Sequence, residues 1–238
     1  MPPPNNSNMT PLFTRPSLRF LWDKGSQELF DPASVDVEIY GLPDDFSISN
    51  RDVISLSGAP RDSSVKCSGV GRAVMVTVMN EAYFEDPMQL TLIRSPGGGW
   101  EAMLQFMKLR ETHRRKRFAA RIFYSMARSA RRMNVRRLYS QALHVDASES
   151  SGGEQWSGVH AAVALGWGGE LPEEVRVALP ASLSGLKTAQ QLVQSRDGMA
   201  WWQENPCTLK LFFDTDLASE CMKRLSAYTR DHGIRPSQ

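Results

Sequence analysis

The sequence predicts an α/β (α+β) fold in which a mixed central β-sheet is flanked by helices and followed by a helical C-terminal extension. Three observations predict it: strand-like apolar runs at residues 73–79 and 88–94, a helical repeat after residue 117, and a return to strand character at residues 135–143. A strand, a helix and a second strand in succession usually form a right-handed crossover. The strands on either side of the helix should therefore be parallel neighbours.

The expected strands carry alternating or continuous apolar residues. Residues 35–40 alternate apolar and polar side chains, and the run AVMVTVM at 73–79 is continuously apolar, as buried strands are. Residues 88–94 and 100–109 flank the sequence SPGGG, which predicts an antiparallel hairpin. The segments GLPDD, SISNRD and GAPRDSS are typical of turns and loops.

An amphipathic helix is expected over residues 118–133. Apolar residues recur there at steps of three and four, at Ala119, Ile122, Phe123, Met126, Ala127, Ala130 and Met133. The opposite, solvent-facing side is expected to carry Arg121, Ser125, Arg128, Arg131 and Arg132. Asn134 can adopt the left-handed conformation that ends a helix.

The C-terminal part is expected to be mainly helical. A short helix over residues 156–165 ends at Gly166, two or three more helical pieces follow up to residue 206, and residues 208–213 form a late strand. A closing helix over residues 217–230 has Asp214 or Asp216 near its N-cap. The adjacent Trp201 and Trp202 are read as one core and one groove residue, in preference to an aromatic wall for a substrate.

Composition places the chain among ordinary globular proteins. It has 238 residues, 41% of them hydrophobic, and no run approaching the ~18 apolar residues that cross a membrane. The Pro- and Asn-rich residues 1–16 are expected to be a disordered tail. Three cysteines without a C-x-x-C pair support neither a disulfide framework nor a structural zinc site. A cytoplasmic protein without a metal or a membrane contact is expected.

Positive charge is concentrated in residues 108–137. This segment holds twelve of the 28 basic residues and one acid, Glu111, so it carries +11 while the rest of the chain carries −9. Such asymmetry indicates a phosphorylated cofactor, a nucleic acid, or acidic surface elsewhere in the same fold. The charge alone leaves these three open.

Residues 107–143, MKLRETHRRKRFAARIFYSMARSARRMNVRRLYSQAL, resemble the central motif of the GNAT acetyltransferases: a strand, a turn of form Q/R-x-x-G-x-G/A, a helix and another strand. Residues 114–119 (RRKRFA) occupy that turn, and Gly166-Trp167 resembles the Gly-aromatic pair that ends a later helix of the family. The resemblance covers residues 70–230. It implies a single GNAT-like domain over residues 17–238, with the cofactor-binding core at 70–171 and the extension at 172–238.

The resemblance implies acetyl-CoA as the cofactor. In such a motif the backbone N–H groups at a helix N-terminus point at the pyrophosphate, and basic side chains neutralise the remaining charge. The matching residues are Arg114, Arg115, Lys116, Arg117, Phe118 and Ala119. The strand before the turn, at Met107 to Leu109, would pair its backbone with the pantetheine arm, which adds Met107 and Leu109 to the expected cofactor-binding residues.

Two residues depart from the family pattern. Arg117 stands where the family has Gly, and Ala162 stands where a Tyr commonly protonates the leaving thiolate. His160 is the candidate acid in its place, against the alternative that a histidine on an apolar helix is structural. Glu111 and His113, at the end of the strand that enters the turn, are candidate bases for the amine, against the alternative that both are exposed turn residues.

Three functions are compatible with these features. The first is an N-acetyltransferase that uses acetyl-CoA and a small amine or protein amine, by direct attack. The second is a catalytically weak or inactive GNAT-like binding protein. The third is a nucleic-acid-binding module built on residues 108–137, which is less well supported because aromatics are not interleaved with the basic run.

Overall fold

A computed structural model describes residues 23–114, 116–142, 158–205, 207 and 209–235. Its strands form one seven-stranded sheet in which spatial order follows chain order. The strands are β1 (Asp36–Tyr40), β2 (Ser64–Val70), β3 (Ala73–Met79), β4 (Met88–Arg94), β5 (Trp100–Phe106), β6 (Val135–Ala142) and β7 (Leu209–Asp214). The predicted tail at residues 1–16 lies outside the described residues.

The pairing makes the sheet mixed. β1 pairs with β2 and β5 with β6 in parallel, whereas every other neighbouring pair is antiparallel. The predicted hairpin is confirmed, because β4 and β5 are antiparallel and are joined by the SPGGG turn. The predicted parallel pair joined by a helix is confirmed as well. The α+β class follows from this mixture of pairings.

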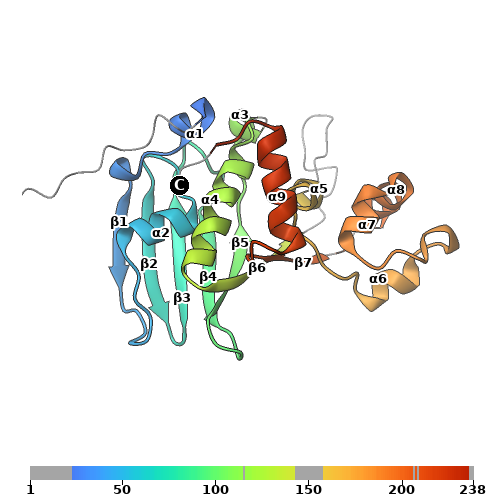
Figure 1. The fold of residues 1–238 in the computed structure, drawn as a ribbon, viewed down its shortest axis with the longest axis horizontal. Coiled ribbons are helices and arrows are strands. Elements are labelled where there is room, and N and C mark those ends of the chain that lie inside the picture. The colour runs from blue at the N-terminus through green and yellow to red at the C-terminus, as the bar shows by residue number, and fades with distance from the viewer. Residues whose placement is uncertain (1–22, 115, 143–157, 206, 208, 236–238) are drawn as a thin grey trace, which may run out of the picture.

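Nine α-helices are present in the described residues: α1 (Lys24–Leu29), α2 (Asn50–Ser57), α3 (Glu111–Arg114), α4 (Phe118–Arg132), α5 (Gly158–Ala164), α6 (Glu173–Ala178), α7 (Ala189–Gln194), α8 (Arg196–Glu204) and α9 (Glu220–Asp231). Two 3-10 turns, η2 (Pro32–Ser34) and η4 (Ala181–Leu183), accompany them. Figure 1 shows α2, α4 and α9 across one face of the sheet, with α6, α7 and α8 grouped beyond the β7 edge. Within the predicted C-terminal extension, residues 173–204 are mainly helical, whereas β7 joins the central sheet.

The core lies between the sheet and α2, α4 and α9. Alternate residues of the central strands point into it, and Val74, Val76, Leu90 and Leu92 are fully buried. The helix α4 contributes a continuous apolar face, as its 3.6-residue repeat predicted. Trp202 is fully buried and Trp201 is partly buried against the core, so the expectation that these tryptophans take part in core packing is confirmed.

The sequence interpretation was wrong at residues 47–52, where the segment SISNRD was taken as a turn. Ser49 caps α2: its hydroxyl accepts the Asp52 N–H at 3.2 Å and donates to the Asp52 carboxylate at 2.6 Å. Gly58, at φ 61°, ends the helix. The polar residues that favour turns also favour helix N-caps. At this segment the packing of α2 on α4 decides that a helix forms and not a turn.

Two boundaries also differ from the prediction. The helix α9 starts after Ser219, whose hydroxyl accepts the Met222 N–H at 3.2 Å, so neither Asp214 nor Asp216 is its N-cap. The strand β5 ends at Phe106 and does not continue to Leu109. The early end of β5 decides which backbone groups remain available next to the basic turn. No helix in the described ranges has the length and apolar character needed to span a membrane.

Candidate functional site

The basic turn predicted at residues 114–119 lies where α3 ends and α4 begins. Arg117 is the N-cap residue of α4, with φ 58° and ψ 25° and no side-chain capping bond. The first intrahelical bond runs from the Arg121 N–H to the Arg117 carbonyl at 3.2 Å. The N–H groups of Phe118, Ala119 and Ala120 therefore have no intrahelical acceptor, and they form the positive end of the helix dipole.

The basic side chains of this turn have different surroundings. Arg114 pairs with the Glu85 carboxylate and donates from Nε to the Leu109 carbonyl at 2.9 Å. Lys116 and Arg117 are exposed, and neither forms an ion pair within the described part of the chain. The Arg117 guanidinium instead donates to the His232 carbonyl at 3.4 Å. Arg115 lies outside the described residues, so Lys116 and Arg117 are the described cations available to an anion.

Glu85 is the acid that neutralises part of the basic segment. Its carboxylate receives Lys108 Nζ at 2.8 Å as well as the Arg114 guanidinium. The hydrogen bond from Lys108 lowers the pKa of Glu85, and Arg114 lowers it further. The same bond raises the pKa of Lys108. The acid-rich EAYFED segment before β4 is the sequence signal for this pairing, which was not predicted.

Arg121 corrects a prediction, because it is 8% exposed and not on the solvent face of α4. Its Nη2 lies 2.5 Å and its Nε 3.1 Å from Asp23 Oδ1, and its Nη1 donates to the Lys116 carbonyl at 2.8 Å. Asp23 also accepts the Arg235 N–H at 2.8 Å. A Cβ on Gly25 would lie 2.6 Å from the Arg121 guanidinium, so the start of α1 packs directly on this side chain. The first turn of α4 is thus held by both ends of the described chain.

The segment after β5 leaves its neighbour β6. The last paired residues of the two strands are Leu104 and Ser140. The backbone at residues 108–110 bonds to the opposite side: the Glu85 N–H donates to the Lys108 carbonyl and the Arg110 N–H to the Tyr83 carbonyl, both at 2.9 Å. Met107 is half-buried and Leu109 is 6% exposed. This bonding to residues 83–85 explains why β5 ends early, and the edges of β5 and β6 that face each other are not paired with one another beyond Leu104 and Ser140 in the described residues.

His113, a predicted base, lies in an aromatic stack. Its ring centroid is 4.8 Å from that of Tyr83 and 5.3 Å from that of Phe118. Nε2 lies 3.0 Å from the Ala82 carbonyl, which requires that nitrogen to carry a proton. Nδ1 is buried and has no hydrogen-bond partner among the described residues. In the neutral ring Nδ1 is therefore the nitrogen able to accept a proton, and the stack must open for a substrate to reach it.

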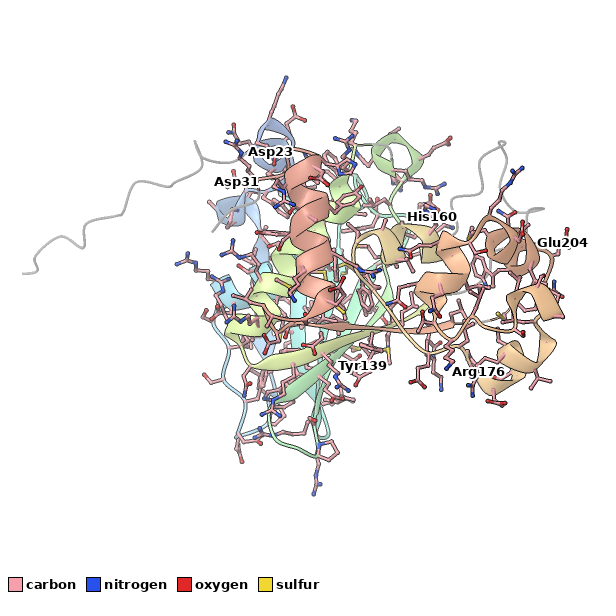
Figure 2. The ribbon with its side chains drawn as sticks, turned by 45° about the vertical axis from the view of Figure 1, so that its right-hand side comes forward. Asp23, Asp31, Tyr139, His160, Arg176 and Glu204 are labelled. Atoms are coloured by element: carbon pink, nitrogen blue, oxygen red, sulfur yellow. The ribbon has the colours of Figure 1, made fainter. Side chains whose placement is uncertain are left out.

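The other two predicted catalytic residues, Glu111 and His160, lie on different helices, α3 and α5. Glu111 is exposed at the start of α3, next to the turn. His160 is half-buried on α5, which Figure 2 shows at the side of the helical extension. The carbonyl of Ala162 accepts the N–H groups of Leu165 and Trp167, both at 3.0 Å. Residue 162 is an alanine, so its side chain offers no hydroxyl.

The Gly166-Trp167 pair closes α5 for a structural reason. Gly166 has φ 94°, and a Cβ there would lie 2.4 Å from the Cys221 carbonyl oxygen. This turn places Trp167 in the core, where its ring centroid is 4.9 Å from that of Phe123 on α4. The pair therefore ties α5 to α4 and α9. These packing contacts fix the position of the Gly166-Trp167 pair beside α4.

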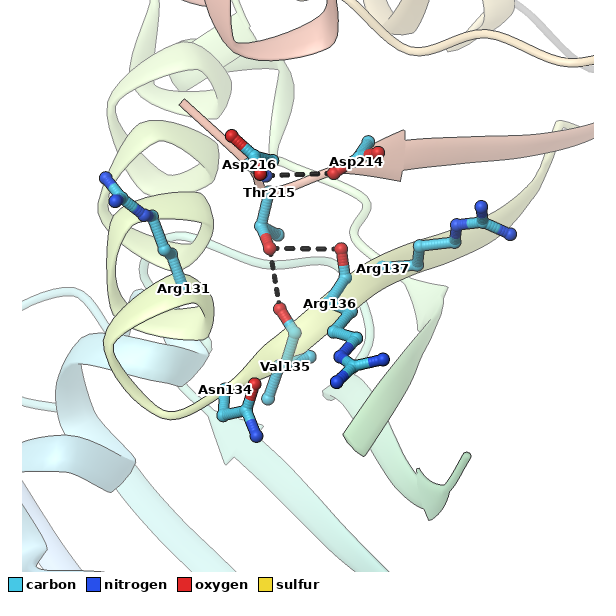
Figure 3. Close-up of a pocket in the computed structure, with 8 residues that line it drawn as sticks. All are labelled: Arg131, Asn134, Val135, Arg136, Arg137, Asp214, Thr215 and Asp216. Atoms are coloured by element: carbon cyan, nitrogen blue, oxygen red, sulfur yellow. Dashed lines mark hydrogen bonds between the residues drawn. The ribbon is translucent and has the colours of Figure 1, made fainter. Parts of the chain in front are cut away.

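A hollow lies at the opposite end of α4 from the basic turn. Figure 3 shows its lining residues, which are Arg131, Asn134, Val135, Arg136, Arg137, Asp214, Thr215 and Asp216. The Thr215 hydroxyl lies 2.7 Å from the Val135 carbonyl oxygen and ties β7 to β6 there. The 15 residues of α4 place this hollow about 22 Å from the turn. Its lining combines three arginines with two aspartates, at the negative end of the helix dipole.

Cysteine and metal chemistry find little support in the described residues. Burial raises the pKa of the Cys67 thiol to about 11, and burial also raises the pKa of Cys221. Such thiols hold little thiolate at neutral pH, so neither is a nucleophile in this state. Within the described ranges, no three His, Cys, Asp or Glu side chains gather in a way that could hold a metal ion.

Comparison with protein-family models, with curated proteins and with solved structures found no match for this chain. A proposal for function therefore rests on the geometry of residues 100–132, which form a strand, the basic turn and a helix, and of the neighbouring β6.

Proposed function

We propose that the protein is an acetyl-CoA-dependent N-acetyltransferase with a GNAT-like fold. One observation carries the proposal: β5 and β6 are parallel and joined by α4, their pairing stops at Leu104 and Ser140, and an exposed basic turn lies at the start of α4. This arrangement is what the resemblance implied for a cofactor held between a diverging strand pair and a helix N-terminus. The unpaired edge of β5 beyond Leu104 supports the placement of the pantetheine arm.

In this proposal the turn holds the pyrophosphate of the cofactor. The N–H groups of Phe118, Ala119 and Ala120 point away from the helix and favour an anion. Lys116 and Arg117 add charge, because both are exposed and free of ion pairs within the described residues. Arg114 contributes less, since its guanidinium is already bound to Glu85. The unpaired backbone at Met107 would hydrogen-bond the pantetheine amides, as the resemblance implies.

Acetyl-CoA would supply the acetyl group as a thioester, which an amine attacks directly. The chain must orient the amine and accept its proton. Glu111 suits the second task because it is exposed beside the turn and forms no ion pair within the described residues. His113 can serve through Nδ1 once its stack opens. His160 is the candidate that returns a proton to the leaving thiolate.

Calorimetric titration with coenzyme A tests the proposal. Lys116→Ala should weaken binding by roughly 10- to 150-fold, since a charge-assisted hydrogen bond contributes about 1.5 to 3 kcal/mol. Arg132→Ala is the matched control, because it removes an exposed cation from the other end of α4 and should leave affinity unchanged. If the full-length protein binds no coenzyme A, or if both variants bind equally well, the placement at the turn is wrong.

A second candidate function is a GNAT-like binding protein with little turnover. It is favoured by Arg117, which keeps a side chain at a left-handed position, and by Ala162, which offers no proton donor. Coenzyme A binding without acetyl transfer to any of a panel of amines would support it. A parallel titration with a short RNA addresses the nucleic-acid alternative, which gains support if RNA binds and coenzyme A does not.

A further inference from the structure

The sheet face opposite α2, α4 and α9 carries a row of seven side chains, five of them aromatic or Met, that crosses all seven strands. By the strand register, successive members of this cross-strand row are direct neighbours. The row consists of Tyr40, Ser68, Met75, Thr91, Met103, Tyr139 and Phe212. The described helices that pack on the sheet lie on its other face, as Figure 1 shows. In the cross-strand row Tyr40 and Phe212 are exposed, Ser68 is buried, and the other four residues are half-buried.

The composition of the cross-strand row is unusual for a solvated face. Tyr40 is 56% and Phe212 is 37% exposed, and Val70 and Ile93 extend the apolar surface beside the row at 58% and 41%. An antiparallel sheet with one wet face normally alternates apolar inward and polar outward residues. Tyr, Phe and Met are enriched in the centres of protein interfaces. A row of this kind therefore indicates a surface that is covered by a partner.

The order of residues in the cross-strand row identifies the partner as a second copy. Read from either end, the row begins with an aromatic residue, has Met at the third position and reaches Thr91 at the centre. A two-fold axis along the strands through Thr91 would stack Tyr40 on the partner's Phe212 and Met75 on the partner's Met103. Such an interface is isologous, so each contact occurs twice.

The charges beside the cross-strand row select the same axis. Glu38 and Lys66 are register partners on β1 and β2, and Lys210 is the corresponding residue of β7, paired with Gln141. The axis along the strands brings Glu38 over the partner's Lys210. An axis across the strands through the row would instead place β1 over the partner's β1, so Glu38 and Lys210 would not face each other. Opposite charges that face each other are favourable, so the first arrangement is preferred.

The face has a suitable size. Seven strands spaced by about 4.8 Å and about seven residues long, at about 3.3 Å per residue, cover roughly 700 to 800 Å² in projection. A standard interface buries about 800 Å² of accessible surface per partner. Protruding side chains give this face a larger accessible surface than its flat projection, so the face is large enough for such an interface. We propose that the protein forms a two-fold symmetric dimer through the cross-strand row. The start of α4 lies on the opposite face, so this dimer leaves the basic turn open and does not depend on the proposed function.

Sedimentation velocity of the full-length protein over a concentration series tests the proposal. The unaltered protein should be a dimer, and Thr91→Lys should produce a monomer, because it places two ammonium groups together on the axis. Far-UV circular dichroism confirms that the variant is folded. The matched control Lys223→Glu alters an exposed charge on α9 and should leave the dimer intact. A monomeric unaltered protein, or a dimer that persists in the Thr91→Lys variant, would overturn the proposal.

A charge exchange tests the direction of the axis. Glu38→Lys and Lys210→Glu should each raise the dissociation constant about tenfold, because each opposes two like charges across the interface. The combined variant Glu38→Lys with Lys210→Glu should recover the affinity of the unaltered protein. Loss of the ion pair between Glu38 and Lys66 within one chain is common to the single Glu38 variant and the combined variant, so recovery cannot arise from that pair. A combined variant that is weaker than both single variants would refute this axis.

Discussion

Arg121 Nη2, on the first turn of α4, lies 2.5 Å from Oδ1 of Asp23, the residue that caps α1. The two side chains are only 10% and 14% exposed. Asp23 also forms two hydrogen bonds with the backbone of Arg235. Its N–H donates to the Arg235 carbonyl at 3.2 Å, and its carboxylate accepts the Arg235 N–H. One ion pair therefore joins the start of the described chain, its end and the helix that positions the candidate site.

Removing either partner of this pair should destabilise the fold. Asp23→Ala or Arg121→Ala leaves one charge buried and uncompensated, which costs about 3 to 5 kcal/mol of the free energy of unfolding. Urea unfolding followed by circular dichroism measures this change. Glu220→Ala is the control, because its pair with Arg224 is solvent-exposed and should contribute less than about 1 kcal/mol. Equal effects of the buried and exposed variants would show that the Asp23 pair is not structural.

The same pair predicts how stability depends on pH. Burial alone would raise the pKa of Asp23, but hydrogen bonds from Arg121, Ser26 and Arg235 outweigh burial and lower it. A depressed pKa in the folded state gives stability that is present above the unfolded value of about 3.9 and is lost as pH falls through the folded value. The stability difference between the native protein and Asp23→Asn should thus shrink below about pH 4. Denaturant titrations at several pH values measure it, and a constant difference would contradict the prediction.

Arg117 should be a strained residue. Its φ of 58° lies in the left-handed region, where a side chain costs roughly 1 kcal/mol relative to glycine. Arg117→Gly should therefore raise the free energy of unfolding by up to about 1 kcal/mol, despite loss of the exposed bond to the His232 carbonyl. Asn134→Gly, at φ 56°, is the matched comparison and should gain less, because Asn tolerates this conformation. A larger gain at Asn134 than at Arg117 would be inconsistent with strain at the turn.

The proposed enzyme should turn over slowly because Ala162 offers no proton donor. Loss of a general acid typically slows transfer by about 10²- to 10⁴-fold without abolishing it, since a thiolate is a tolerable leaving group. Ala162→Tyr should raise kcat in an assay that follows free thiol. His160→Ala decides the alternative: if it removes most activity while Ala162→Tyr changes nothing, His160 is the acid and the interpretation of Ala162 is wrong.

Local pattern was enough to predict much of the sheet and the central helix. The apolar runs of β3 and β4 and the 3.6-residue repeat of α4 place side chains on one face whatever the rest of the chain does. Asn134, predicted to end α4 in a left-handed conformation, has φ 56°. These features depend on neighbours within a few residues, so sequence alone contains the information for them.

The surroundings of the candidate site were decided by contacts between residues far apart in the chain. Arg121 has the spacing of a solvent-facing arginine, and it is buried because Asp23, 98 residues away, supplies its counter-charge. Arg114 looks like a phosphate ligand in sequence, but Glu85 neutralises it, and residues 83–85 draw the segment after β5 away from β6. A charge pattern shows that partners must exist. Only the tertiary structure decides which partner each charge has, because long-range pairing depends on where the whole sheet places the two chain segments.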